Sequence, residues 1–397
     1  MIPRHLATVL RREATRNPVV TVLGPRQSGK TTLVRSTFPE HAYRSLERPD
    51  ERSAAREDPL AWLASCRGGT IIDEVQRVPD LLSYLQVNVD EDDTPGRFIL
   101  TGSQNLLLMQ SVAQTLAGRT AILHLYPFSL SELFSRPPID STAPFAGEIG
   151  APPDKRSLWE IVWMGLYPRI HDKDLDPRRW LGDYFRTYVE RDLRDVLAVM
   201  DLQSFERFMR LVAARTGSEL NLTSLASDAG ISQPTAKRWI SSLSTGFLIA
   251  LLPPHFANYR KRLRKRPKLH VLDTGLVCYL LGIQDPASLA CHPLRGSIFE
   301  SFVVGELIKA FAHAGRDAPL FHWRDATGHE VDVLIDLGDR LLPIEVKSGS
   351  TLASDTIDGL RWWTGLPANP NDTGILVHGG VTQQVRGAIR IVPWYLQ

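Results

Sequence analysis

The segment from Gly24 to Thr31 constrains the fold of this 397-residue chain more tightly than any other part of the sequence. It reads GPRQSGKT and fits the spacing GxxxxGK[ST], with the β-branched run 19–23 before it and a helical pattern after it. Glycines let backbone N–H groups turn toward an anion, and the start of the following helix adds positive charge. This context predicts a phosphate-binding loop made of Gly24, Arg26, Gln27, Ser28, Gly29, Lys30, Thr31 and Thr32. A chance match in a glycine-containing turn is the alternative.

The chemistry of this loop depends on two side chains and on an acidic pair further along the chain. The Lys30 ammonium is expected to reach the β- and γ-phosphates of ATP, and the Thr31 hydroxyl is expected to bind Mg²⁺. The apolar strand expected at 70–72 ends in Asp73 and Glu74. Asp73 is predicted to hold Mg²⁺ through water, and Glu74 to orient the attacking water. An ordinary acidic pair at a strand end is the alternative.

Polar residues also follow the strand expected at 97–101. Ser103 or Gln104 is predicted to sense the γ-phosphate or to hold the lytic water. Arg119 is a candidate donor to the transition-state charge, either in its own subunit or across an oligomer interface. A surface or capping arginine is the alternative reading of Arg119.

Short apolar runs alternate with helical patterns in the first third of the chain. Strands are expected at 19–23, 70–72, 97–101 and 121–125, with a helix at 81–89. Strands joined by crossover helices predict an α/β fold with a parallel sheet covered on both faces. The segment 136–155 is rich in Pro, Gly and Ala and is expected to be a linker or insertion. A helical pattern then extends from Trp159 to about Val199.

Several of these segments together resemble the prokaryotic AAA-type P-loop ATPases that carry a C-terminal domain of unknown function. The segments are 24–31, 71–76, 101–104, 116–119 and 125–129. The resemblance covers nearly the whole chain and implies ATP and Mg²⁺ as cofactors. It implies a AAA-type ATPase domain at 1–135, a helical and winged-helix domain at 155–280, and a nuclease-like α/β domain at 290–397.

The middle of the chain contains a helix, a tight turn and a second helix, from about 222 to 244. Gly230 suits the turn, and Ser232 is a good N-cap for the second helix. The second helix has an apolar face made of Ala236, Ile240 and Leu243. This is helix-turn-helix spacing, and a strand near 269–272 would form part of a wing.

A basic run follows this motif, from Arg260 to Lys268. Seven of its nine residues are basic and none is acidic. Without these seven, the 46 basic residues of the chain fall to 39 against 44 acidic ones, so the near-neutral total conceals one concentrated basic segment. Such a run on a wing suits contacts to DNA phosphates. A solubilising loop or a wing that contacts only protein is the alternative.

The last part of the chain gathers carboxylates at a characteristic spacing. Glu300 lies in an apolar helical pattern, and Asp332 lies in an alternating strand. Twelve residues separate Asp332 from Glu345-x-Lys347, which resembles the core of the PD-(D/E)xK nucleases, the restriction-endonuclease-like fold. There, Asp332 and Glu345 would bind Mg²⁺, and Lys347 would stabilise the phosphate or position a water.

The resemblance extends to a helix carboxylate and departs from the family pattern at one position. Glu300 corresponds to the helix carboxylate that joins the metal site in many members, but Asp332 follows Val331 rather than the usual proline. An ExK sequence on a surface strand is the alternative reading. The fold also serves as a binding scaffold, so cleavage does not follow from the residues alone.

Composition excludes several classes of protein. With 43% hydrophobic and 23% charged residues, the chain is neither disordered nor fibrous. Three cysteines without CxxC spacing predict neither disulfides nor zinc, and apolar runs too short for a membrane helix favour a cytoplasmic protein. A homo-oligomer is compatible with the sequence. Three hypotheses stay open: an ATP-controlled nuclease, a DNA-binding or regulatory ATPase whose C-terminal fold binds without cleaving, and a protein-remodelling or signalling ATPase.

Overall fold

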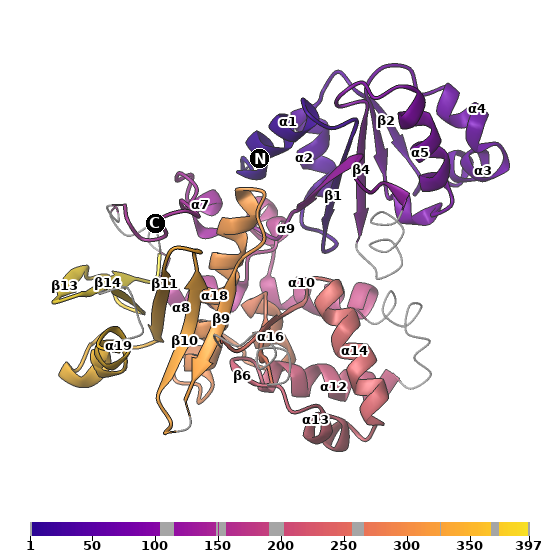
Figure 1. Cartoon of the computed structure of the whole chain (residues 1–397). Coiled ribbons are helices and arrows are strands. Elements are labelled where there is room, and N and C mark those ends of the chain that lie inside the picture. Colours follow the sequence, from indigo (N-terminus) through magenta and orange to yellow (C-terminus); the bar gives the residue numbers. More distant parts are fainter. Residues whose placement is uncertain are drawn as a thin grey trace. The chain divides into compact units, whose positions relative to one another are not determined.

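The computed structural model describes residues 2–103, 115–147, 150, 156–189, 202–255, 266–325, 327–366 and 373–395. Two compact units are present (Figure 1). The first consists of Met1–Phe128 together with Thr245–Phe247 and Ala312–Arg316. The second consists of Ser129–Ser244, Leu248–Phe311 and Asp317–Gln397. The finer division at 135, 155–280 and 290 stays a prediction.

The first unit is built on a five-stranded parallel sheet, which confirms the predicted α/β class for this part of the chain. Its strand order is β2-β3-β4-β1-β5. The strands are β1 (Val19–Gly24), β2 (Ala42–Ser45), β3 (Thr70–Asp73), β4 (Phe98–Ser103) and β5 (Thr120–His124). Strands β1, β3 and β4 are buried along their whole length, as expected of a parallel sheet covered on both faces.

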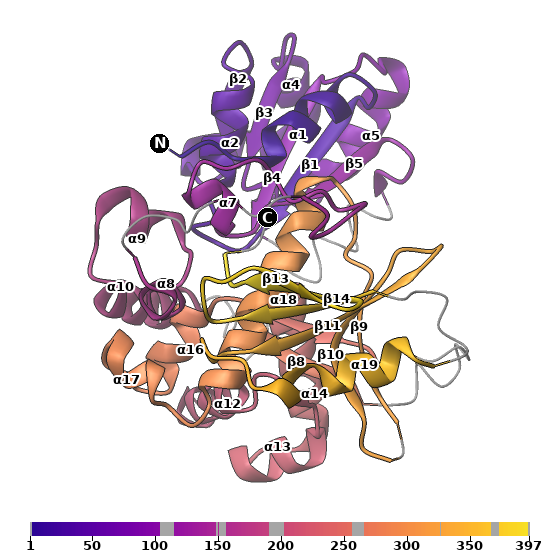
Figure 2. The same cartoon turned by 90° about the vertical axis from the view of Figure 1, so that its left-hand side faces the viewer.

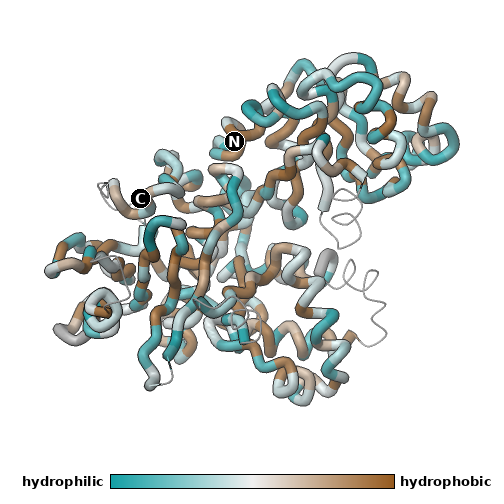
Figure 3. The backbone as a smooth tube through the Cα atoms, in the orientation of Figure 1, coloured by the Kyte–Doolittle hydropathy of each residue, from teal (hydrophilic) through white to brown (hydrophobic). Residues whose placement is uncertain are grey.

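Two separate cores lie on the two faces of this sheet. Side chains alternate along β4, so Ile99 joins one core while Phe98 and Leu100 join the other. The first core is completed by α1 (Leu6–Ala14) and α2 (Lys30–Thr37). The second is completed by α3 (Pro49–Glu57), α4 (Pro59–Ala64), η1 (Val75–Arg77) and α5 (Leu81–Glu91). Figure 3 shows the hydrophobic strands in brown and the largely hydrophilic α3 in teal.

The second unit begins with several short helices, most of which lie in the part of the chain where a helical pattern follows Trp159. They are α7 (Leu130–Leu133), α8 (Leu158–Met164), α9 (Pro168–Lys173), α10 (Pro177–Tyr184) and the short π-helix η2 (Phe185–Val189). The break after α8 occurs at Gly165, whose positive φ of 70° favours glycine. Pro168 and Pro177 then start new helices in their first turn, where a missing N–H costs nothing.

The helix, turn and second helix expected at about 222–244 are α13 (Leu222–Ala229) and α14 (Gln233–Thr245), preceded by α12 (Leu202–Ala214). Gly230 ends α13 in a left-handed conformation, and the Ser232 hydroxyl accepts the Thr235 N–H at 3.2 Å. The apolar face of α14 is buried. An antiparallel sheet of order β6-β8-β7 follows, made of β6 (Ser218–Glu219), β7 (Ile249–Leu252) and β8 (Lys268–Val271).

The rest of the second unit surrounds a six-stranded mixed sheet of order β13-β14-β12-β11-β10-β9. Its strands are β9 (Leu320–Arg324), β10 (Glu330–Asp336), β11 (Leu341–Lys347), β12 (Gly374–His378), β13 (Gln384–Arg386) and β14 (Ile389–Pro393). Figure 2 shows α19 (Asp358–Thr364) in front of these strands and α18 (Arg295–His313) behind them. The remaining elements are α16 (Thr274–Leu280), α17 (Pro286–Ala290) and η3 (Ser354–Ile357). Among the described residues, no helix combines the length and apolar character needed to cross a membrane.

Candidate functional site

The predicted phosphate loop joins the end of β1 to the start of α2. Gly29 has a φ of 92°, a left-handed conformation that strains residues with a side chain. The Lys30 ammonium is buried and donates to the carbonyl oxygens of Gly24 and Pro25 at 3.0 and 2.8 Å. Burial lowers the pKa of Lys30 to about 8, although Glu74 and Asp73 act in the opposite direction. Lys30 therefore sits inside the loop with two carboxylates nearby.

Two contacts fix the position of this loop. A Cβ atom at Gly24 would collide with the carbonyl oxygen of Leu125, so only glycine allows the backbones to approach this closely. The Arg4 guanidinium donates to the carbonyl oxygens of Ser28 and Tyr126, both at 2.6 Å. Arg4 thus joins the loop to the segment after β5. Nothing in the sequence pattern around Arg4 predicts this contact.

Asp73 ends β3 beside the start of α2. One of its oxygens, Oδ1, accepts hydrogen bonds from the Thr31 hydroxyl at 2.9 Å and from the Thr101 hydroxyl. The other, Oδ2, accepts a hydrogen bond from the Tyr43 hydroxyl at 2.7 Å. Sequence reasoning placed Thr31 and Asp73 together but missed the roles of Thr101 and Tyr43. Thr101 carries a signal, because it lies near the end of the strand next to β3.

Glu74 follows Asp73 with a φ of 60°, a strained conformation for a residue with a side chain. Its carboxylate accepts hydrogen bonds from the Ser103 hydroxyl at 3.3 Å and from the Gln76 amide. Ser103 pairs with Gly24 in the register of β4 and β1, so it lies at the same sheet edge as the loop. The structure therefore brings Lys30, Glu74 and Ser103 to one place.

Other residues named in the sequence analysis lie differently. Ser28 is buried, Arg26 is half-buried, and Gln27 and Thr32 are exposed within the loop and first helical turn. Gln104 lies outside the described residues. Arg119 precedes β5 at the amino end of the strand, whereas the loop follows the carboxyl end of β1. The Arg119 guanidinium pairs with Asp90. A role for Arg119 within its own chain has no geometric support, and a role across an oligomer interface stays a prediction.

The four residues of the nuclease-like motif come together in the second unit. Strands β10 and β11 pair antiparallel, and the Val346 N–H donates to Asp332 Oδ2 at 2.9 Å. The Lys347 ammonium lies 2.5 Å from Glu345 Oε1. Burial, and then the Asp332 charge, raises the pKa of Glu345 to about 7. The same two causes raise the pKa of Glu300, on α18, to about 8.

Lys268 corrects one part of the expected DNA-binding run. Residues 260–265 lie outside the described residues, and Arg266 is exposed. Lys268 is only 5% exposed, and its ammonium lies 2.7 Å from Glu300 Oε1 and 3.1 Å from Glu330 Oε1. It is therefore a buried partner of carboxylates, not a surface contact for DNA. Polar and apolar residues alternate along β8, which places Lys268 and His270 on one face of the strand. This alternation was the sequence signal that Lys268 belongs to a strand rather than to the basic run.

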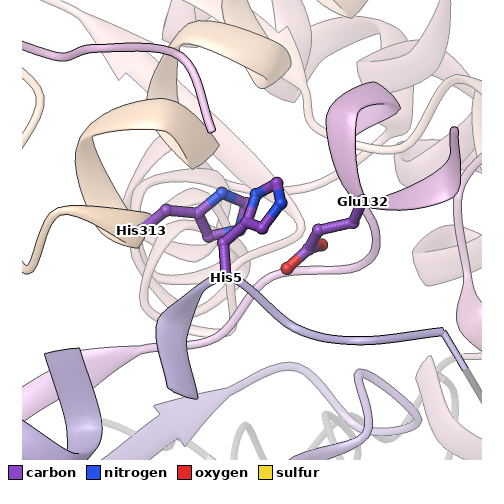
Figure 4. A group of neighbouring side chains, drawn as sticks. All are labelled: His5, Glu132 and His313. Carbon is purple, nitrogen blue, oxygen red and sulfur yellow. The ribbon is translucent and has the colours of Figure 1, made fainter. Parts of the chain in front are cut away.

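Figure 4 shows two histidines that sequence reasoning did not single out, His5 and His313. Both belong to the first unit, and their ring centroids lie 5.2 Å apart with the rings nearly perpendicular. Glu132, also labelled there, belongs to the second unit. Its carboxylate accepts the N–H of Ser129, and its own N–H donates to the Ser129 hydroxyl, so the pair caps α7.

Three regions of the chain match known protein families. Residues 16–134 match a family described as an AAA domain. Residues 155–287 and 295–396 match two domains of unknown function, DUF8612 and DUF4143. The uncharacterized proteins Rv2008c of Mycobacterium tuberculosis and Mb2031c of Mycobacterium bovis are each 32% identical over 354 residues, which covers 88% of this chain and 74% of each relative.

Two solved structures show a weaker likeness to this chain. A Walker-type ATPase of Pyrococcus abyssi has a TM-score of 0.39 at 13% identity, covering 70% of this chain and 96% of its own. A signal transduction ATPase with a tetratricopeptide repeat sensor, from Pyrococcus horikoshii, has a TM-score of 0.24 at 12% identity. The match covers 79% of this chain and 47% of that protein. Both likenesses are too low to support a conclusion about this chain.

The parallel sheet, the loop around Lys30 and the AAA match at 16–134 define a P-loop ATPase domain of the AAA type. This confirms the coarser part of the resemblance stated from the sequence. The chain belongs to one family with the two mycobacterial proteins, and it carries the AAA domain followed by two domains of unknown function.

Proposed function

We propose that this chain binds ATP with Mg²⁺ and hydrolyses it at the site formed by β1, β3 and β4. The proposal depends on one observation. The Asp73 carboxylate accepts a hydrogen bond from the Thr31 hydroxyl at 2.9 Å, beside the buried Lys30. A hydroxyl and a carboxylate at this distance fit the oxygen ligands that Mg²⁺ prefers. When bound, Mg²⁺ would neutralise phosphate charge.

The side chains of this chain have separate roles in the proposed reaction. Lys30 binds the β- and γ-phosphates with its ammonium, and the loop N–H groups surround them. Glu74 orients the attacking water and accepts its proton. The Ser103 hydroxyl, 3.3 Å from Glu74, keeps that carboxylate in place. Tyr43 and Thr101 hold Asp73 and are positioning residues.

Phosphate release from ATP, measured with Mg²⁺ and with EDTA, tests the proposal. We expect hydrolysis that needs Mg²⁺ and that Lys30→Ala abolishes together with nucleotide binding. Glu74→Gln should keep nucleotide binding, measured with a fluorescent ATP analogue, and lower turnover by about 100-fold or more. Undiminished turnover in Lys30→Ala, or full activity of Glu74→Gln, would remove the assignment.

The second part of the proposal is that nucleotide state controls a winged helix and a nuclease-like domain that act on DNA. Support comes from α13, α14 and the antiparallel sheet β6-β8-β7, the element types of a winged helix. Lys237 and Arg238 are exposed on α14. Most of the basic run connects β7 to β8 and could add phosphate contacts.

Fluorescence anisotropy with duplex DNA at increasing salt tests the DNA contact. We expect binding that weakens steeply with salt, and that weakens further when the basic residues from Arg260 to Arg266 are neutralised. Lys268 should be left intact, because it is buried among carboxylates. Equal affinity of the neutralised variant would show that the run does not contact DNA.

Two functions are proposed for the nuclease-like site, and a different observation favours each of them. Asp332 and Glu345 share one site on adjacent strands, which fits Mg²⁺-dependent cleavage of DNA. Lys268 favours the alternative, a regulatory or protein-remodelling ATPase whose C-terminal fold binds without cleaving, because its ammonium already pairs with carboxylates of the site. Incubation of wild type, Asp332→Ala and Lys347→Ala with plasmid and linear DNA, with and without ATP and Mg²⁺, decides between them. Cleavage that persists in both variants would exclude this site as its source.

A further inference from the structure

Three carboxylates surround the ammonium of Lys268. The Nζ atom lies 2.7 Å from Glu300, 3.1 Å from Glu330 and 3.6 Å from Asp332. These carboxylates come from α18 and β10, while Lys268 begins β8 in the three-stranded sheet. At these distances the lysine is the cationic partner of an acidic cluster.

Strand β8 cannot easily withdraw this lysine, because neighbouring contacts hold the strand in register. The Thr216 hydroxyl accepts the Val271 N–H at 2.9 Å and lies 2.7 Å from the Ser301 hydroxyl. The Ser301 hydroxyl in turn lies 3.0 Å from His270 Nδ1. These polar contacts are buried, so breaking them would leave polar atoms without partners. Lys268 is held at the cluster by its own strand.

His270 provides a second, independent indication that the cluster is built around a cation. Its side chain is fully buried on the same face of β8 as Lys268. Within the described part of the chain, His270 Nε2 has no hydrogen-bond partner, and it points toward Glu300 Oε1 at 3.8 Å. An imidazole nitrogen without a hydrogen-bond partner, placed beside a carboxylate, adds a potential ligand to the cluster.

The two lysines near the motif differ in burial and in their partners. The Lys347 side chain is 45% exposed and pairs with Glu345. The Lys268 side chain is 6% exposed and pairs with the other carboxylates of the cluster. A divalent ion placed between Glu300 and Asp332 would meet the Lys268 ammonium at close range, and like charges at such distances repel strongly inside a protein.

We propose that Lys268 is a built-in cation that takes the place of a metal ion between Glu300, Glu330 and Asp332, and so weakens divalent-cation binding at the nuclease-like site. The inference rests on the proposed assignment of this cluster as a metal site. It gives β8 a direct role in that site, because the buried contacts of this strand hold the Lys268 ammonium among the carboxylates.

The test measures Mn²⁺ binding by the full chain without DNA or ATP, using electron paramagnetic resonance of free Mn²⁺. Lys268→Met removes the charge and keeps the length of the side chain, and Lys268→Arg keeps the charge. We expect Lys268→Met to bind Mn²⁺ at least about ten-fold more tightly than wild type, and Lys268→Arg to resemble wild type. Mn²⁺ that remains bound in Asp332→Asn belongs to other sites and is subtracted.

A charge-balanced variant covers the case in which Lys268→Met fails to fold. Replacing both partners of a buried ion pair is tolerated far better than removing one, so Lys268→Met/Glu300→Gln should fold. It should also bind Mn²⁺ more tightly than wild type, through Asp332 and Glu345. Affinity equal to wild type in this variant, or a gain that persists when Asp332→Asn is added, would overturn the proposal. Mn²⁺ binding is measured without DNA. The proposal about Lys268 can therefore fail while the proposed DNA binding or cleavage holds, and the proposed DNA function can fail while the Lys268 proposal holds.

Discussion

Asp73 is held on both carboxylate oxygens before any nucleotide chemistry begins. Thr31 and Thr101 donate to Oδ1, and Tyr43 donates to Oδ2 at 2.7 Å. Burial and then the hydrogen bond to Asp73 raise the pKa of Tyr43 to about 12, so its hydroxyl keeps its proton throughout the neutral range. The tyrosine thereby fixes the orientation of a carboxylate on which Mg²⁺ binding is proposed to depend.

Tyr43→Phe should therefore weaken the use of Mg²⁺ without removing a proposed ligand. A hydrogen bond to a charged group contributes about 1.5–3 kcal/mol, so the Mg²⁺ concentration for half-maximal ATP hydrolysis should rise by roughly ten-fold. Tyr84→Phe is the matched control, because Tyr84 is also 37% exposed and lies on α5. Equal Mg²⁺ dependence of the two variants would contradict a positioning role for Tyr43.

At the scale of elements, the junction of α8 and α16 depends on a glycine and an aspartate. A Cβ atom at Gly275 would lie 2.6 Å from the carbonyl oxygen of Met164, closer than real contacts allow. Asp273 caps α16 by accepting the Leu276 N–H at 3.0 Å, and it also accepts the Leu166 N–H at 2.9 Å. The two residues allow α8 and α16 to pack in direct backbone contact.

Gly275→Ala should destabilise the second unit although alanine favours helices. The forced shift of backbone should cost about 1–3 kcal/mol, which exceeds the gain of about 0.5–1 kcal/mol in helix propensity. Gly296→Ala on α18 is the control, since a Cβ there would have only a distant neighbour, and it should be neutral or stabilising. Urea unfolding of both variants measures the difference, and a stabilised Gly275→Ala would contradict the packing argument.

Asp273 should give the stability of the second unit a dependence on pH. Burial raises the pKa of this carboxyl above 3.8, although the N–H groups of Leu166 and Leu276 oppose the rise. The Asp273 carboxyl therefore binds a proton more readily in the folded state than in the unfolded chain. The contribution of Asp273 to the free energy of unfolding falls as pH rises above about 4. Asp273→Asn should remove this slope, whatever its effect on absolute stability. Denaturation midpoints measured from pH 4 to 7 compare the two chains, and parallel slopes would exclude the effect.

The elements also show which structural features can be read from sequence. Strands β1, β3, β4 and β5 follow from buried β-branched runs, and the loop follows from its glycine spacing. Strand β2 was missed because it is short and mostly exposed at the sheet edge, so it has little apolar pattern. Lys268 was misassigned because a run of neighbouring charges hid the alternation of β8. The polar face of β8 is explained by α18, whose Glu300 and Ser301 contact Lys268 and His270. The sequence pattern alone does not place that helix beside the strand.

At the scale of the whole molecule, the first unit is not one continuous piece of chain. Thr245–Phe247 and Ala312–Arg316 return to it. The Phe247 side chain packs into the core beneath β1 and β4, with its ring 5.2 Å from the rings of both His124 and Tyr126. A residue far along the sequence therefore completes the core of the ATPase domain.

Phe247→Ala should lower the stability of the first unit by about 3 kcal/mol or more, because it leaves a cavity in a packed core. Val381→Ala, at a site that is 60% exposed, should change stability by less than about 0.5 kcal/mol. Thermal unfolding with and without an ATP analogue follows the effect at the ATPase domain. If Phe247→Ala lowered the midpoint only of an unfolding transition that the ATP analogue does not shift, Phe247 would lie outside the ATPase domain.

Helix α1 has a consequence for anyone who expresses parts of this chain. The similarity to AAA domains begins at residue 16, yet Leu6, Val9 and Leu10 on α1 cover one face of the sheet and Arg4 holds the phosphate loop. A fragment cut at that boundary would carry an uncovered apolar patch, which invites aggregation. Fragments for biophysical work should therefore begin before Arg4.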